Sequence, residues 1–511
     1  MIVKRIGKTR KLFVFLRAHR LAIFDDVLQA KLVGMYRGAG KVPVPPALLA
    51  MVVLLQAYMG ISDAEAVQLS VLDARWQLVL DTLTDDAPPF SQGALADFRQ
   101  RLIRHELDTE LLARTVEIAT QASGFDPRKL PKTLRLAVDS APLEGAGRVE
   151  DTLNLLGHAA RKIVMCAAAL LDTTVEAVAS AAGIPVLLAP SIKRGLDREW
   201  GPDGAMRDAV TLLVAQLDAL ETWLNHTFAG ALAQPPLQPL LATLHQLRHQ
   251  DLEPDPDGGG VRIREDGVPD RRISIEDPDM RHGRKSKSTR IKGYKQHIAI
   301  DLDTQLIVAC VVAPANQPEY HALAPILEQL THAQRTVTEL NIDRGYISSP
   351  AISTLQRRGV QIFCKPWVAK NDNGQFTKAD FHFDFRRNTV TCPAGEVRPI
   401  VLGKKLSFGR RTCEPCALRD QCTVDTWHGR QFSVRHDEPL QRKFRALIAT
   451  PTGRNILRRR VTIEHRLAHV TRRKGHRARY RGTRNNLFDL RRTAAIENLI
   501  VLQRRDFLNA A

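Results

Sequence analysis

Three acidic residues, far apart in the sequence, have the types and settings that metal-dependent phosphodiester chemistry requires. Asp139 ends the apolar run LRLAVD, Asp343 ends VTELNID, and Glu464 lies in the arginine-rich segment RRRVTIEHRLAH. The first two are expected at the ends of buried strands and the third on a helix. Carboxylates brought together in this way can hold Mg²⁺, which leaves room for water and phosphate oxygens. Because paired metal ions can activate an attacking oxygen and stabilise a leaving one, the trio indicates nucleotidyl transfer.

The overall charge points to the same class of partner. The 511 residues carry a formal net charge of +19, and the sequence pI is about 9.9. A chain this basic favours polyanions, and nucleic acid first among them. The charge is concentrated, because residues 451–511 hold 16 Lys and Arg against 4 Asp and Glu, while residues 281–297 hold seven basic residues and no acid. From these two segments we expect the following contacts with DNA phosphates: Arg284, Lys285, Lys287, Lys292, Lys295, Arg460, Arg472, Arg473 and Lys474.

A cysteine cluster is the third feature with possible chemistry. Four of the seven cysteines follow the spacing C-x20-C-x2-C-x5-C, namely Cys392, Cys413, Cys416 and Cys422. Such a set can form a tetrahedral site, most simply for structural Zn²⁺. An iron–sulfur cluster and four unliganded thiols are the alternatives. The other three cysteines lie in apolar runs and are expected to be packing residues.

The elements that must position these residues can be predicted in outline. Residues 1–125 have helical periodicity, with Ser62 and Glu65 as a capping box and Ser91 as a second cap. A first strand covers 134–139. The run GYKQHIAIDLDTQLIVACVVAPAN predicts two strands that turn at Asp303-Thr304. A helix, the strand VTELNID, a helix ended by Gly359 and the strand VQIFCKPW follow. A mixed sheet covered by helices is the natural packing of this order.

Two insertions interrupt this order. Residues 150–280 predict a helical and loop insertion, in which the acidic, Gly- and Pro-rich stretch 251–280 is expected to be a mobile loop. Residues 370–440 are short, polar and β-like, and contain the cysteine cluster. The segment from 440 to 508 is helical and basic. The most apolar stretch, from Ala47 to Gly60, is too short to span a bilayer, and the N-terminus lacks a secretory signal, so we expect a cytoplasmic protein that joins the nucleoid when it binds DNA.

Several motifs together resemble one family. The segments VDSAPLEG, HGRKSKSTRIKGYKQHIAID, VAPANQPEYHAL, NIDRGYISS and RRRVTIEHRLAHVTRRKGHRARYRG are similar to those of DDE-type transposases of bacterial insertion sequences, in the branch with a Cys-rich insertion before the final Glu. The resemblance covers roughly residues 20–500. The last acid departs from the family pattern, because Leu457 stands at the usual Tyr position and Thr471 at the usual Lys position.

The resemblance implies an α/β fold: an RNase H-like mixed-sheet catalytic domain at 130–508, with the two insertions, behind a helical N-terminal domain that binds DNA. It implies catalysis by Asp139, Asp343 and Glu464 with Mg²⁺ or Mn²⁺. The implied partners are the terminal inverted repeats and a target duplex, which a homodimer would bind. No membrane partner is expected. Two alternatives stay open: an RNase H-like nuclease that does not join strands, and an inactive transposase-derived DNA-binding protein.

Overall fold

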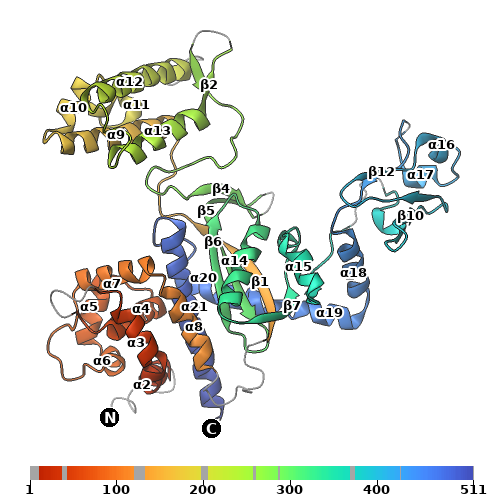
Figure 1. The fold of residues 1–511 in the computed structure, drawn as a ribbon, viewed down its shortest axis with the longest axis horizontal. Helices are drawn as coiled ribbons and strands as arrows, with labels where there is room; N and C mark the ends of the chain where they lie inside the picture. The colour runs from red at the N-terminus through yellow and green to blue at the C-terminus, as the bar shows by residue number, and fades with distance from the viewer. Residues whose placement is uncertain are drawn as a thin grey trace.

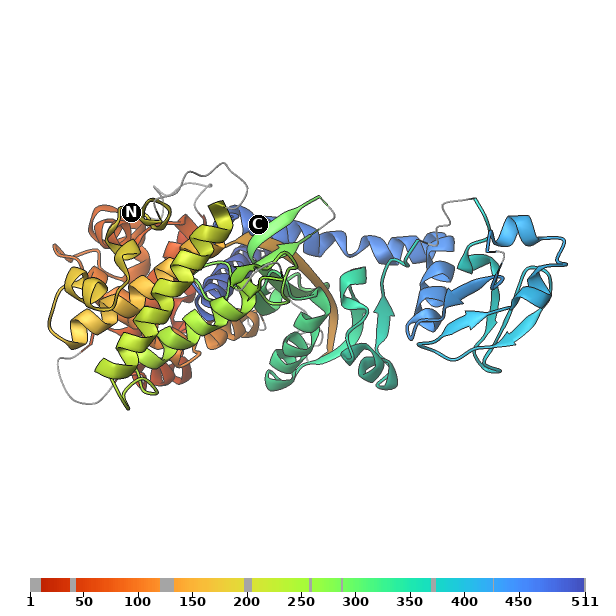
Figure 2. The ribbon, with the colours of Figure 1, turned by 90° about the horizontal axis from the view of Figure 1, so that it is seen from above.

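The computed structural model describes residues 11–36, 43–119, 133–196, 205–256, 260–285, 288–368, 374–425 and 427–509. A central sheet lies between two insertions, with the N-terminal helices packed beside it (Figure 1). Seen from above, the helical insertion and the Cys-rich insertion lie at opposite ends of an elongated molecule (Figure 2). Asp139, Asp343 and Glu464 all belong to the central part.

The N-terminal region is helical, as predicted. Its caps are the expected ones, because Ser62 and Glu65 form a capping box and the Ser91 side chain accepts from the backbone N–H of Ala94. Its apolar residues merge with those of the sheet into one continuous core. The helices are α2 (Lys11–Ile23), α3 (Asp26–Val33), α4 (Pro46–Met59), α5 (Asp63–Leu72), α6 (Ala74–Leu80), α7 (Gln92–Arg104) and α8 (Asp108–Ile118).

The central sheet is mixed, and its strands and helices follow one another along the chain as predicted, with the short strand β4 added before β5. The strands β6, β5 and β1 are antiparallel neighbours, and β1, β7 and β8 are parallel neighbours, while β4 pairs with the start of β5. This arrangement with flanking helices is an RNase H-like fold. The bounds are β1 (Thr133–Glu144), β4 (Arg281–Arg284), β5 (Arg290–Asp301), β6 (Ile307–Pro314), β7 (Thr336–Asn341) and β8 (Gln361–Phe363).

The first strand is longer than the sequence predicts. Asp139 does not end β1 but stands inside it, opposite Ile298 of β5. The reason is that β5 pairs with β1 without interruption as far as Glu144 opposite Gly293. The turn after β5 is as expected, because the Asp301 carboxylate accepts hydrogen bonds from the backbone and hydroxyl of Thr304.

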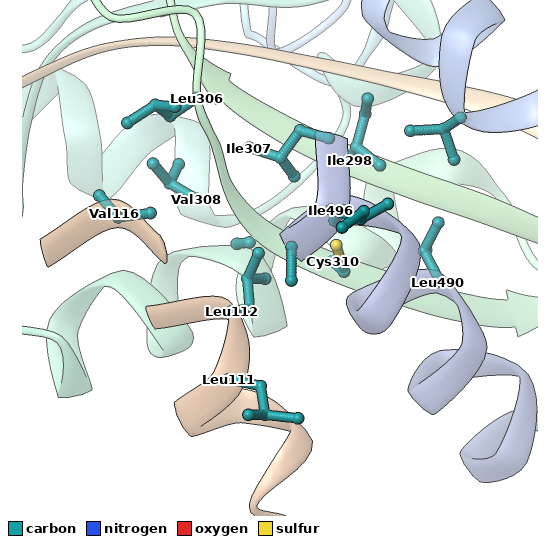
Figure 3. Packing of buried hydrophobic residues seen from close by; sticks show 14 of the residues in the cluster. Leu111, Leu112, Val116, Ile298, Leu306, Ile307, Val308, Cys310, Leu490 and Ile496 are labelled. Carbon is teal, nitrogen blue, oxygen red and sulfur yellow. The ribbon is translucent and has the colours of Figure 1, made fainter. Parts of the chain in front are cut away.

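Helices cover the sheet and tie it to both ends of the chain. The helix α21 (Thr483–Asn509) packs on β6 and α8, and α20 (Val461–Lys474) packs on β1. Figure 3 shows α8 and α21 beside the sheet, with Leu111, Leu112 and Val116 on α8 and Leu490 and Ile496 on α21. The helices α14 (Leu323–His332) and α15 (Ala351–Arg357) complete the domain.

The helical insertion has a hydrophobic core of its own. Its main helices are α9 (Thr152–Leu170), α10 (Val175–Ala181), α11 (Ile192–Gly195), α12 (Ala205–Thr227) and α13 (Leu237–Asp251). By length and composition α9 could cross a membrane, and the bent pair α4–α5 could pass the same test as a broken span, but much of α9 is buried in this core. The short length expected of the Ala47 stretch is confirmed, because α4 ends at Met59.

The expectation of a mobile loop at 251–280 is wrong for the residues described there. The strands β2 (Leu252–Pro254) and β3 (Val261–Ile263) form a hairpin, and Ile273, Ser274 and Ile275 are buried. The Arg272 side chain donates to the carbonyls of Ser274 and Ile275, which fixes the return to the sheet. Composition missed this order because part of it comes from outside the stretch: the Gln250 side chain bonds the backbone of Arg272, and the Ile275 N–H donates to Glu150.

The Cys-rich insertion is a small β unit built around phenylalanines. Its strands are β9 (His382–Asp384), β10 (Thr389–Thr391), β11 (Val397–Pro399), β12 (Lys405–Ser407) and β13 (Gln431–Ser433). Two single turns, α16 (Arg410–Cys413) and α17 (Arg419–Cys422), carry Cys413 and Cys422, and Cys416 lies between them. The chain returns to the sheet through α18 (Glu438–Ala449) and α19 (Pro451–Arg458).

Candidate active site

The two aspartates meet where β7 leaves β1. The two strands pair only as far as Ala137 opposite Asn341, so the edge of β1 is open at Asp139. Asp343 follows β7 and begins the short helix η4 (Arg344–Tyr346), where its Oδ1 accepts from the backbone N–H of Arg344 at 2.8 Å. Parallel strands end at one edge of a sheet, which is why these distant residues become neighbours.

Arg460, immediately before α20, joins the two aspartates to Glu464. Its Nη2 lies 3.6 Å from Asp139 Oδ2, 3.8 Å from Asp343 Oδ2 and 3.1 Å from Glu464 Oε1. Arg460 and Glu464 are four residues apart, so both project from the same face of the helix. The structure therefore brings the three predicted carboxylates around a single point.

The electrostatics of this point are dominated by burial and by the mutual charges. Burial raises the pKa of the Asp139 carboxyl, with Arg460 and the Ser140 N–H opposing the rise and Asp343 and Glu319 adding to it. Burial works against the charged form of Arg460, yet the carboxylates of Asp139, Asp343 and Glu464 outweigh it and leave the pKa raised. Asp139 is the most enclosed of the three acids, with 15% of its side chain exposed against 48% for Asp343 and 50% for Glu464.

The trio lines a cavity of about 760 Å³ that also carries basic side chains. Lys285 and Arg472, both exposed, belong to its lining, together with His476. A cavity with carboxylates at one place and cations around them suits a phosphodiester, whose charge the cations offset.

The carboxylates of Asp139, Asp343 and Glu464 are suitable ligands for a divalent metal, although in this structure they surround the Arg460 guanidinium. Three carboxylate oxygens near one point are the ligands that Mg²⁺ prefers. Among the described residues, no group of three or more His, Cys, Asp or Glu side chains is already in a metal-holding arrangement. Since Arg460 occupies the point between the acids, a metal ion there requires the guanidinium to move away.

The nine basic residues predicted to contact DNA differ in their surroundings. Arg284, Lys285, Lys292 and Arg472 are exposed. Arg460 lies in the acidic trio, and Lys287 lies outside the described residues.

Three of the predicted DNA contacts are instead engaged inside the protein. Lys295 is buried and donates to the Gln317 carbonyl, and Lys474 has 1% of its side chain exposed and pairs with Asp489. Arg473 pairs with Glu497 at 2.7 Å and donates to the Tyr58 carbonyl. We therefore do not retain these three as phosphate contacts.

The four clustered cysteines lie around one small hollow of the β insertion. Burial raises the pKa of Cys422, Arg430 opposes this, and the nearby thiols of Cys413, Cys392 and Cys416 add to it. Cys392, which is separated from Cys413 by 20 residues in the sequence, is therefore close to the other three cysteines in the structure. Cys310 and Cys364 are buried as expected, while Cys166 is partly exposed.

Sequence reasoning missed one acid of the cavity. Glu319, in the short helix η3 (Glu319–Ala322), lines it together with the trio, and its Oε1 accepts a hydrogen bond from Ser140 Oγ. The only sequence signal was its place in PANQPEYHAL, one of the segments that carry the family resemblance.

Two known families match separate parts of the chain. Residues 257–499 match the family described as "Transposase DDE domain", and residues 11–101 match the family described as "Transposase domain (DUF772)". No curated protein and no solved structure shows significant similarity to the chain. Asp343 and Glu464 fall inside the first match, whereas Asp139 lies between the two. The chain belongs to the DDE-type transposases of bacterial insertion sequences, so it acts on DNA in transposition.

Proposed function

We propose that this transposase cuts DNA at the ends of its element and joins the freed 3′ ends to a target duplex, in a reaction that needs a divalent metal. The supporting observation is the convergence of Asp139, Asp343 and Glu464 on one point, each 3.1–3.8 Å from Arg460 Nη2. Isolated strand-end acids would not share a cation in this way.

Asp139, Asp343 and Glu464 are the residues that would hold Mg²⁺ or Mn²⁺. When bound, the metal supplies activation of an attacking oxygen and stabilisation of the leaving one. The chain's own cations do the positioning. Lys285 and Arg472 line the cavity and can neutralise phosphates, which fixes the strand without reading its bases.

In this scheme Arg460 has one role before the metal binds and another role afterwards. Its Nη1 is buried and has no hydrogen-bond partner among the described residues, which is a local cost. A guanidinium displaced from the acids could donate to a phosphate oxygen of the bound strand and recover these contacts. Arg460 thus neutralises the acids before metal binds and the DNA afterwards.

The substrates are inferred from the reaction class. The terminal inverted repeats present two equivalent ends, and a homodimer gives each end its own set of carboxylates. A target duplex then receives both ends.

The joining step separates this proposal from its alternatives. We would incubate the protein with Mg²⁺, a labelled duplex that carries an element end, and an unlabelled target plasmid. Labelled end joined to the plasmid is the expected product. Cleavage without joining would instead identify a nuclease, and binding without cleavage would identify an inactive DNA-binding protein.

A further inference from the structure

We propose that Glu319 is a positioning residue of the active site, which ties the strand that bears Asp139 to the turn that bears Asp343. This inference rests on the proposed function, because it concerns how the carboxylate trio is held for its metal. The three segments involved are β1, η3 and η4.

The first contact joins Glu319 to β1. Glu319 Oε1 accepts a hydrogen bond from the hydroxyl of Ser140, the residue that follows Asp139. Ser140 is 7% exposed, so water competes little for this bond. Since Ser140 is adjacent to Asp139, fixing its side chain restrains the backbone on which the most enclosed acid of the trio stands.

The second contact joins Glu319 to the turn after Asp343. Any Cβ at Gly345 would overlap Glu319 Oε2, so the carboxylate lies directly against the backbone of the Asp343–Tyr346 turn. A glycine there permits this close approach. One carboxylate group therefore touches the residues that follow both catalytic aspartates.

The turn has a second anchor on the sheet. Ser140 stands opposite His297 in the β1–β5 pairing, so their side chains project from one face. The hydroxyl of Tyr346 lies 2.7 Å from His297 Nδ1. Burial lowers the pKa of His297 to about 3 and raises that of Tyr346 far above its usual value, so a neutral tyrosine donates to a neutral histidine.

Nearby Lys295 leaves Glu319 available for this role. Its Nζ donates to the carbonyl of Gln317 at 2.8 Å. Lys295 also acts on Glu319 through its positive charge, but the Glu319 carboxylate accepts its hydrogen bond from Ser140. Losing that acceptor would leave the nearly buried Ser140 hydroxyl with the Tyr346 side chain as its remaining partner, and the Asp139 segment less restrained.

The test measures Mn²⁺ binding to the full chain without DNA, by electron paramagnetic resonance of free Mn²⁺. We expect Glu319→Ala to weaken Mn²⁺ affinity about tenfold, as is typical when a residue that orients a ligand is lost. Ser140→Ala should weaken it to a similar extent, and the double variant should be no worse than either single one. Gly345→Ala should also weaken it, because the methyl group displaces the Glu319 carboxylate.

The conservative variant Glu319→Gln distinguishes positioning from direct cation binding. The glutamine amide oxygen can still accept from Ser140, so its Mn²⁺ affinity should stay within about twofold of the wild type. An equal loss in Glu319→Gln and Glu319→Ala would overturn the positioning role, and so would wild-type affinity in Glu319→Ala. Thermal melting of each variant identifies a general loss of folding. If Glu319→Ala does not fold, the Mn²⁺ affinities of Ser140→Ala and Glu319→Gln test the positioning role.

Asp139→Asn separates the failure of this inference from that of the proposed function. If Asp139→Asn binds Mn²⁺ as the wild type does, the proposed metal site is wrong and the role of Glu319 falls with it. If Asp139→Asn loses binding while Glu319→Ala keeps it, only the role of Glu319 is overturned.

Discussion

The Arg460 guanidinium lies at the point where the carboxylates of Asp139, Asp343 and Glu464, the proposed catalytic acids, converge. This guanidinium lies 3.1–3.8 Å from an oxygen of each acid and is largely shielded from solvent, with 17% of the side chain exposed. Three carboxylates gathered around one point repel one another strongly unless a cation lies between them. At the proposed metal site, Arg460 would therefore compete with the metal ion for these carboxylates.

Removing this arginine should strengthen metal binding in the absence of DNA. We expect Arg460→Gln to raise Mn²⁺ affinity about tenfold, equivalent to about 1.4 kcal/mol, because no cation has to be displaced. Titration with Mn²⁺ measures the change. The matched control is Arg459→Gln, since Arg459 is half-exposed and approaches Glu339 rather than the trio. Weaker binding in Arg460→Gln would show that the arginine assembles the site instead of competing for it.

At the residue level, the sequence identifies acids better than it identifies cations. Asp139, Asp343 and Glu464 were predicted from strand ends, helix context and family resemblance, and the structure brings them together. Lys295 and Lys474 were expected to bind DNA because they lie in basic segments. Their burial depends on Gln317 and Asp489, which local sequence does not connect to them. Glu319 was missed because a lone acid in a loop carries no pattern.

The elements of the fold were predictable wherever local chemistry sets their ends. Ser62, Ser91 and the Asp303-Thr304 turn were assigned correctly because capping and turn residues act on their immediate neighbours. The continuation of β1 past Asp139 was not, since it depends on pairing with β5, over 150 residues later in the sequence. The ordered 251–280 segment was missed in part because Glu150, more than 100 residues earlier, accepts from the Ile275 N–H.

We expect the Cys-rich insertion to bind a structural metal ion. Cys392, Cys413, Cys416 and Cys422 surround one hollow in a unit whose own core is small, and such units gain folding energy from zinc. We expect about one Zn²⁺ per chain by elemental analysis, and its loss in Cys413→Ser. Cys166→Ser, in the other insertion, is the control and should keep the metal. Iron in place of zinc would support the iron–sulfur alternative, and a metal-free wild type would contradict both.

Across the whole molecule, the N-terminal helices and the C-terminal helix share one hydrophobic core. Asp108 at the start of α8 is buried and accepts hydrogen bonds from Arg484 and Arg491 of α21. Removing one partner from a buried ion pair leaves an uncompensated charge. Asp108→Ala should therefore lower the free energy of unfolding by about 3–5 kcal/mol in chemical denaturation. Exposed Glu176→Ala should change it little, and an equally stable Asp108→Ala would contradict the coupling of the two ends.

The same whole-molecule view predicts which cations carry DNA affinity. Lys285 and Arg472 are exposed at the active-site cavity, whereas Lys474 is paired inside the protein. Lys285→Ala combined with Arg472→Ala should weaken binding to any duplex and reduce the salt dependence, with the slope of log K against log salt falling by about 0.9 for each lost phosphate contact. Fluorescence anisotropy across a salt series measures this. An unchanged slope would place the DNA on another surface.

The central claim is that Asp139, Asp343 and Glu464 form one metal-dependent catalytic site, and cleavage of element-end DNA by single variants tests it most directly. In each of Asp139→Asn, Asp343→Asn and Glu464→Gln, Mg²⁺-dependent cleavage should fall at least about a thousandfold, while DNA affinity measured without metal stays within a few-fold of the wild type. The matched control is Glu328→Gln, an acid on α14 with 72% of its side chain exposed, and it should cleave normally. Wild-type cleavage in any of the three variants would remove that residue from the site and contradict the account.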